Sequence, residues 1–248
     1  MIVNLNDVDD FSNKFDSLKE TLFKEGHLLL RGLFSDSETK LVREEFLKVY
    51  KSLEPKGTTN VQPSEIVNND LLKFSVGQFS GAQSIPRFFL ILYRNDETLS
   101  ASEKVVFDRL VELWEIMQGR SFTKEELDTN GSFFAKRYQY YPSGGGFLCT
   151  HADSYNVDTS KKIGGEFIQF VLPITQKGID YTEGGGYVVK DGKQVCNEDA
   201  IQLGDLIVYD GAIEHGVADI DPFKPMNLDG NSGRVVMFIT LYKKLKDK

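Results

Sequence analysis

Residues 133–153 read FFAKRYQYYPSGGGFLCTHAD, and this stretch decides the fold of the chain. Its first part is a strand-like run that ends at Tyr141 and Pro142, and the three glycines that follow indicate a turn into a second strand. The second strand ends near His151, and Asp153 follows two residues later. Side chains at positions i and i+2 of a strand project to the same face, so both can reach one metal ion. His-x-Asp alone is a frequent chance match, and its meaning depends on its surroundings.

A second histidine, His215, completes a possible metal site. It follows the strand-like run 203–209, and a further glycine turn stands at residues 183–187, between the two histidines. Two imidazoles and one carboxylate on one side of a metal leave three positions open, the arrangement found in non-haem Fe(II) oxygenases. We therefore predict that His151, Asp153 and His215 bind Fe(II) and form the catalytic centre. The alternative is that Asp153 caps a turn and His215 is a hydrogen-bonded core residue.

The order of these motifs resembles the Fe(II)/2-oxoglutarate-dependent oxygenase superfamily over roughly residues 131–242. The resemblance implies a double-stranded β-helix core (jelly-roll, cupin-like) of the phytanoyl-CoA/prolyl-hydroxylase type, with the metal at its open mouth. Short strands at 166–172, 205–209 and 234–242 also favour two facing antiparallel sheets. The expected fold class is mainly β with flanking helices (α+β).

The resemblance also assigns a role to Arg234, which heads an apolar run after His215. In the family, a basic residue at this place holds the far carboxylate of 2-oxoglutarate, the co-substrate. A guanidinium suits that role because it donates two parallel hydrogen bonds to a carboxylate. The gap after His215 is longer than in the commonest family pattern, and Lys224 within it is the competing cation. The alternative is that Arg234 pairs with a neighbouring acid.

Three residues before the glycine turn are further candidates for binding the co-substrate. Tyr141, or Tyr140 on the other face of the strand, is expected to add a hydroxyl to the same carboxylate. Arg137 lies at an even spacing from Tyr141 and therefore shares its face. We expect Arg137 to meet 2-oxoglutarate or an anionic substrate, with a structural salt bridge as the alternative.

The N-terminal part, residues 1–130, is expected to be a helical scaffold with one strand and a lid. Apolar residues at helical spacing predict helices over about residues 9–25 and 101–118. The apolar segment 26–34 is expected to form the strand. The residues Ser35-Asp36-Ser37-Glu38 form a plausible capping box for a further helix.

Residues 54–86 are polar and rich in turn residues. A long stretch with little regular structure is often a functional loop. We predict a mobile cover here that orders when substrate binds, with Leu72, Phe74 and Phe79 as apolar anchors. The alternative is a static, permanently packed segment.

Three residues near these motifs are given structural roles. We expect His27 to be structural or solvent-facing and Trp114, at helical spacing, to belong to the core. Cys149 is expected to be a small buried apolar residue beside the metal site.

Composition limits the kinds of partner. The chain has 248 residues, expected to form a single domain, and its formal net charge is −8. This balance argues against a nucleic-acid partner, and no apolar run is long enough to cross a membrane. The first ten residues are unlike a signal or transit peptide. Two cysteines are too few for a disulfide framework, so a cytoplasmic location is expected.

The resemblance implies a dioxygenase that uses Fe(II), 2-oxoglutarate and O2 to oxidise, and above all to hydroxylate, an unactivated C–H bond of a small metabolite. Succinate and CO2 would be released. Asp153 argues against halogenation, because halogenating members have a small residue in its place. Oxidative cyclisation, desaturation, oxidation of a protein, and a catalytically silent cupin-like binding module are the alternatives. The sequence indicates neither the substrate nor the oligomeric state.

Overall fold

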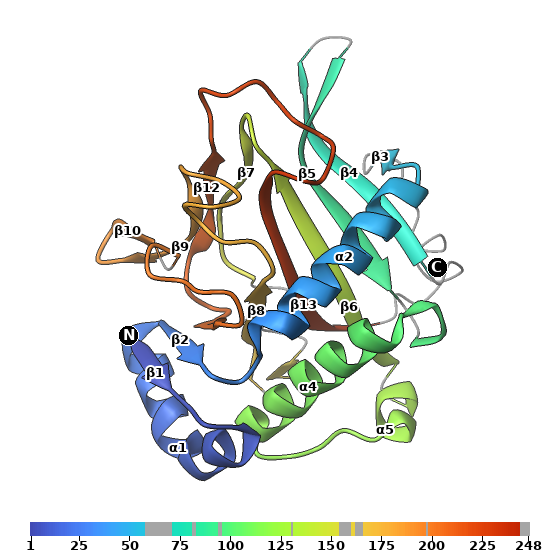
Figure 1. The fold of residues 1–248 in the computed structure, drawn as a ribbon. Helices are drawn as coiled ribbons and strands as arrows, with labels where there is room; N and C mark the ends of the chain where they lie inside the picture. Colours follow the sequence, from blue (N-terminus) through green and yellow to red (C-terminus); the bar gives the residue numbers. More distant parts are fainter. Residues whose placement is uncertain are drawn as a thin grey trace.

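Two β-sheets face each other in the computed structural model, which describes residues 1–57, 71–80, 83–93, 96–129, 131–153, 160–161, 166–196 and 198–243 (Figure 1). Within these residues the large sheet has nine strands, in the spatial order β1 (Ile2–Asn4), β2 (His27–Arg31), β11 (Leu206–Asp210), β8 (Ile168–Pro173), β13 (Gly233–Lys243), β6 (Ser132–Pro142), β5 (Gln83–Tyr93), β4 (Leu71–Ser80) and β3 (Lys56–Gly57). The small sheet has the order β10 (Lys193–Cys196), β9 (Gly185–Lys190), β12 (His215–Ile220) and β7 (Gly146–His151).

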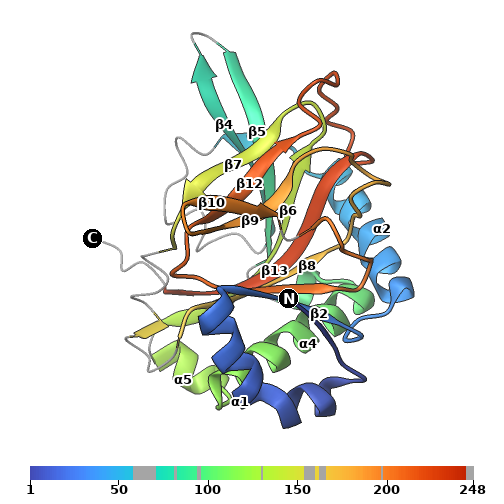
Figure 2. The same cartoon turned by 90° about the vertical axis from the view of Figure 1, so that its left-hand side faces the viewer.

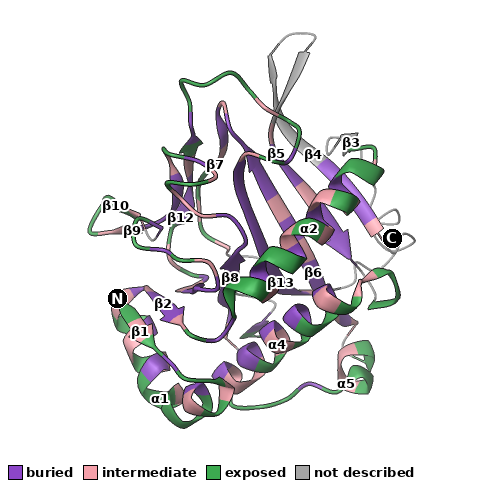
Figure 3. Cartoon of the chain, in the orientation of Figure 1, coloured by how far each residue is buried: buried purple, intermediate pink, exposed green. Residues whose placement is uncertain are grey.

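Helices cover the face of the large sheet that points away from the small sheet (Figures 1 and 2). They are α1 (Val8–Glu25), α2 (Asp36–Ser52), α4 (Ala101–Gln118) and the short α5 (Lys124–Thr129), with a 3-10 turn at Asp96–Thr98. α1, α2 and α4 each have buried residues on one side and exposed residues on the other, whereas α5 has no buried residue (Figure 3). None of the described helices is long and apolar enough to span a membrane.

Local chemistry sets the ends of these helices. Ser35 and Ser100 each form a complete capping box, with Glu38 and Glu103 as the returning side chains. Gly119 ends α4 in the left-handed conformation, where a residue with a side chain would be strained. The predicted helices at 9–25 and 101–118 and the predicted capping box are therefore confirmed.

The pairing of β6 with β13 builds the centre of the large sheet. Their antiparallel register runs from Gly233 opposite Pro142 to Lys243 opposite Ser132. Because side chains alternate along a strand, Tyr138 and Tyr140 pack into the main core beneath the helices. The alternate residues of β6 face the small sheet, and this second face carries the candidate site.

The prediction that residues 54–86 form a loop is wrong for the part of this segment that the structure describes. Strands β4 and β5 pair as a long antiparallel hairpin, from Leu71 opposite Tyr93 to Ser80 opposite Gln83. The side chains of Leu72 and Phe74 are buried with Leu92 from the paired strand, so this segment is half of a sheet. The expectation of a single strand in the N-terminal part is wrong as well. Residues 58–70 and 81–82, which also belong to the predicted cover at 54–86, lie outside the described residues.

Asp221 forms hydrogen bonds with three connecting segments: the glycine turn between β6 and β7, the segment before β9, and the segment that follows β12. Its buried carboxylate accepts hydrogen bonds from Ser143 Oγ at 2.9 Å, from Thr182 Oγ1 at 2.6 Å and from the Glu183 backbone N–H at 3.0 Å. Lys224 also donates to it, at 2.9 Å. Burial alone raises the pKa of Asp221, but these donors outweigh it and leave the pKa below its ordinary value.

We expect Asp221→Ala to lower the free energy of unfolding by about 3 kcal/mol, because one buried and three partly buried hydrogen bonds lose their charged acceptor. Urea unfolding measures this change. The matched control is Asp219→Ala, which alters an exposed side chain on β12 and is expected to change stability by less than about 0.5 kcal/mol.

The contribution of Asp221 also has a defined pH dependence. Because the pKa is lowered on folding, the stabilisation is present above the ordinary value of 3.8 and is lost as the pH falls below it. Equal stability of the two alanine variants at neutral pH would contradict this role of Asp221.

Candidate active site

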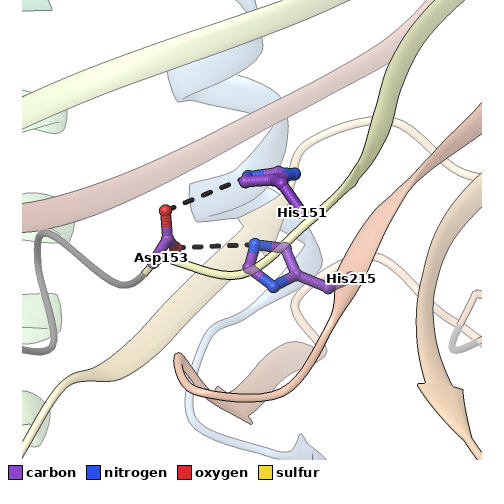
Figure 4. Close-up of side chains that lie close together, drawn as sticks. All are labelled: His151, Asp153 and His215. Carbon is purple, nitrogen blue, oxygen red and sulfur yellow. Dashed lines mark ion pairs between the residues drawn. The ribbon is translucent and has the colours of Figure 1, made fainter.

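The three predicted metal ligands meet at the mouth between the two sheets (Figure 4). His151 ends β7 and is the cross-strand partner of His215, which begins β12. Asp153 follows β7 and is held by a hydrogen bond from its backbone N–H to the carbonyl of Gly211, at 3.2 Å. Its carboxylate oxygens lie 3.9 Å from His151 Nε2 and 3.5 Å from His215 Nε2. One ligand atom from each residue lies within 4.8 Å of the others.

Backbone carbonyls orient both imidazole rings. Nδ1 of His151 lies 2.8 Å from the carbonyl oxygen of Cys149, and Nδ1 of His215 lies 2.9 Å from that of Ile213. A carbonyl oxygen only accepts, so both Nδ1 atoms carry the proton and both Nε2 atoms present a lone pair. Burial lowers the pKa of His215, which favours the neutral ring that binds metals. This N,N,O donor set fits a divalent iron ion.

A cavity of about 270 Å³ opens beside these ligands, close to the lower limit of pockets for small molecules. Its polar lining includes the three ligand residues together with Arg234, Arg137 and Tyr141. Much of the remaining wall is apolar and comes from both sheets, with Phe88, Leu90, Leu148, Val171, Ile207, Val217, Val236 and Phe238. Residues more than a hundred positions apart in the sequence thus share one space.

Arg234 lies in this wall but already has a partner. Its Nε and Nη2 donate to the carboxylate of Glu198 at 2.8 Å and 2.5 Å. Glu198 is fully buried, and the hydroxyl of Tyr181 donates to it at 2.5 Å. Burial by itself raises the pKa of Glu198, but Arg234, together with hydrogen bonds from Tyr181 and the Gly186 backbone, leaves the pKa below its ordinary value, so the pair is charged. The structure therefore shows the pairing with an acid that was the alternative for Arg234, although Arg234 still faces the cavity.

Of the other candidates for binding the co-substrate, Tyr141 lines the cavity, whereas Tyr140 and Lys224 do not. Tyr141 is buried in the cavity wall, with its ring centroid 5.2 Å from the Arg234 guanidinium carbon. Tyr140 points the opposite way and donates its hydroxyl to the carbonyls of Asn227 and Ser232, so it is not a candidate ligand. Strand alternation is the reason for this correction. Lys224 pairs with Asp221 and is absent from the lining of the described cavity.

Three residues were predicted to have structural roles: Trp114, His27 and Cys149. The structure does not bear out all three predictions. Trp114 is 3% exposed and donates its ring N–H to the carbonyl of Ile168, which confirms its place in the core. His27 begins β2 and is not one of the three clustered ligand residues. Cys149 is exposed, so the expectation that it is buried is wrong. Its strand, β7, lies at an edge of the described small sheet and pairs there with β12 alone.

Comparison with known proteins gives a fold but no close relative. No family model matches the chain, and no curated protein matches it. A prolyl hydroxylase from Trichoplax adhaerens, solved with a fragment of the hypoxia inducible factor oxygen degradation domain, superimposes with a TM-score of 0.61 at 14% identity, covering 95% of this chain and 92% of the other. A Pseudomonas putida prolyl-4-hydroxylase gives a TM-score of 0.55 at 12% identity, with 92% and 98% covered. JOX2, solved with 2OG, Fe and JA, gives 0.56 at 12% identity, with 98% and 76% covered.

The chain therefore shares the fold of these structures, and its two facing sheets have the double-stranded β-helix arrangement that its motifs led us to expect. The predicted fold class, mainly β with flanking helices, is confirmed.

Proposed function

We propose that the protein is an Fe(II)- and 2-oxoglutarate-dependent dioxygenase that hydroxylates a C–H bond of a small metabolite. One observation carries the proposal: two oriented histidines and Asp153 converge at a cavity that also holds an arginine. The ligands of the JOX2 structure, 2OG and Fe, are those that these residue types suit. We assign the whole chain, 1–248, to this domain, with residues 1–130 as its scaffold.

Each residue has a distinct task in the proposed reaction. Bound iron would activate O2, with one oxygen atom entering succinate as 2-oxoglutarate loses CO2 and the other entering the substrate C–H bond. His151, Asp153 and His215 would hold the metal, and three protein donors would leave room for reactants to bind it. Arg234 and Tyr141 orient the far carboxylate of 2-oxoglutarate. The apolar wall excludes water from the reacting groups.

Two features limit the alternatives. Asp153 fills a ligand position, so no place is left there for halide. A silent binding module would not need two imidazoles fixed by backbone carbonyls with both Nε2 atoms facing one carboxylate. Cyclisation and desaturation use the same ligands, and product analysis distinguishes them from hydroxylation.

One experiment tests the binding of both the metal and the co-substrate. Adding 2-oxoglutarate to the anaerobic Fe(II) protein is expected to produce a visible charge-transfer band, and admitting O2 is expected to yield succinate. Zn(II) in place of Fe(II) is the control, because zinc has no redox chemistry and gives no such band. A wild-type protein that shows neither band nor succinate would rule out the proposed function.

The proposed setting follows from charge and cysteine content. We propose a small-molecule partner and a cytoplasmic location, with neither nucleic acid nor a membrane as partner. The chain has 37 acidic and 29 basic residues, and this negative net charge disfavours contact with phosphate backbones. Cys149 and Cys196 are both free, in keeping with a reducing compartment.

A further inference from the structure

The cavity contains a second guanidinium, that of Arg137 on β6. Its Nη1 donates to the hydroxyl of Tyr242 at 2.6 Å, and its Nη2 donates to Thr240 Oγ1. The guanidinium carbon lies 4.1 Å from the ring centroid of Phe238, the cross-strand neighbour of Arg137. These contacts fix the plane of the guanidinium in the cavity wall.

The two arginines of the cavity differ in how their charge is compensated. Arg234 shares its charge with the buried carboxylate of Glu198. Among the described residues, the hydrogen-bond acceptors of Arg137 are neutral hydroxyls, and its buried Nε has no hydrogen-bond partner. The salt bridge considered for Arg137 is therefore not found in that part of the chain. A partly buried cation without a counter-ion is costly, and an anion entering the cavity would remove that cost.

The two arginines also start from well-separated points of the sheet. Arg234 lies opposite Tyr141 in the sheet register, whereas Arg137 lies four residues further along β6, a strand distance of about 13 Å. The metal ligands line the same cavity. A co-substrate held at Arg234 thus leaves Arg137 for a second molecule.

We propose that Arg137 binds a carboxylate of the primary substrate, which makes that substrate a small organic acid. The proposal rests on the proposed function, because it gives Arg234 to the co-substrate. A guanidinium with no charged partner among the described residues matches the single charge of a carboxylate, and its fork matches the two oxygens. The hydroxyl of Tyr242 lies beside this fork as a second polar group. Apolar residues next to Arg137, such as Phe238, would contact the carbon skeleton.

The experiment compares acids with their neutral amides in the anaerobic Fe(II) protein saturated with 2-oxoglutarate. The probes are benzoate and cyclohexanecarboxylate against benzamide and cyclohexanecarboxamide, and binding is measured by calorimetry. We expect each acid to bind the wild type at least about 10-fold more tightly than its amide. Arg137→Gln is expected to abolish this preference, and Arg137→Lys to keep part of it.

Two controls separate this proposal from the proposed function. Arg120→Gln changes an exposed arginine outside the cavity and is expected to keep the full preference for acids. The charge-transfer band with 2-oxoglutarate is expected to appear at wild-type 2-oxoglutarate concentrations in Arg137→Gln, which also shows that this variant folds. Acids that bind no better than amides, or a preference that survives in Arg137→Gln, would overturn the assignment. A missing band in the wild type would instead overturn the proposed function.

Discussion

Asp153→Ala is expected to reduce succinate formation from 2-oxoglutarate by at least about 100-fold, since loss of even an outer partner of a metal ligand costs 10- to 100-fold. Asp153 supplies the sole carboxylate among the three clustered residues, and its two oxygens face the two imidazoles. Without it, two neutral rings remain, and the affinity for Fe(II) is expected to fall together with turnover. Anaerobic iron titration and succinate release measure the two effects separately.

Asp219→Ala is the matched control for this prediction. It removes an exposed carboxylate from β12, the strand that His215 begins, and does not touch the ligand cluster. Its turnover and iron affinity are expected to equal those of the wild type. Full turnover with unchanged iron affinity in Asp153→Ala would place the metal elsewhere.

Arg234→Ala is expected to raise the 2-oxoglutarate concentration needed for half-maximal turnover by about 30-fold or more, the equivalent of about 2 kcal/mol or more for a lost charge-assisted pair. The requirement for iron is expected to change far less. The same substitution leaves Glu198 charged and buried without its partner, so it also lowers the free energy of unfolding by about 3–5 kcal/mol. Activity alone therefore cannot separate binding from folding.

A paired substitution separates the two effects. Arg234→Met combined with Glu198→Gln removes both charges, and much of the lost stability is expected to return because no buried ion is left unpaired. The weak binding of 2-oxoglutarate is expected to persist in this double variant. Wild-type 2-oxoglutarate dependence in the double variant would show that Arg234 is only a structural partner of Glu198.

The predictable parts of the fold are those with a local chemical cause. The capping box at Ser35 and the stop at Gly119 involve residues within one helical turn, so their outcome is contained in a few letters of sequence. The ligand cluster was also predictable, because His-x-Asp and the distal histidine each follow a recognisable strand and turn. Strand alternation then decided between Tyr141 and Tyr140, which the sequence alone left open.

The parts that were missed depend on contacts between distant segments. The hairpin of β4 and β5 contains polar and glycine residues that suit a loop, and only its place beside β6 makes it part of the sheet. Glu198 lies 36 residues before Arg234, in a connection with no distinguishing pattern. No local signal shows that this one acid, among many, is buried.

The carboxylate of Asp221 anchors the linker between β12 and β13 immediately after the last residue of β12. At the other end, Gly233 returns the chain to its register opposite Pro142. With both ends fixed, doubling the length of the linker would cost only about 0.6 kcal/mol in loop closure. The separation of His215 and Arg234 in space is thus set by these anchors and not by the number of residues between them. Lineages with this fold can therefore diverge in motif spacing yet preserve the same constellation of side chains.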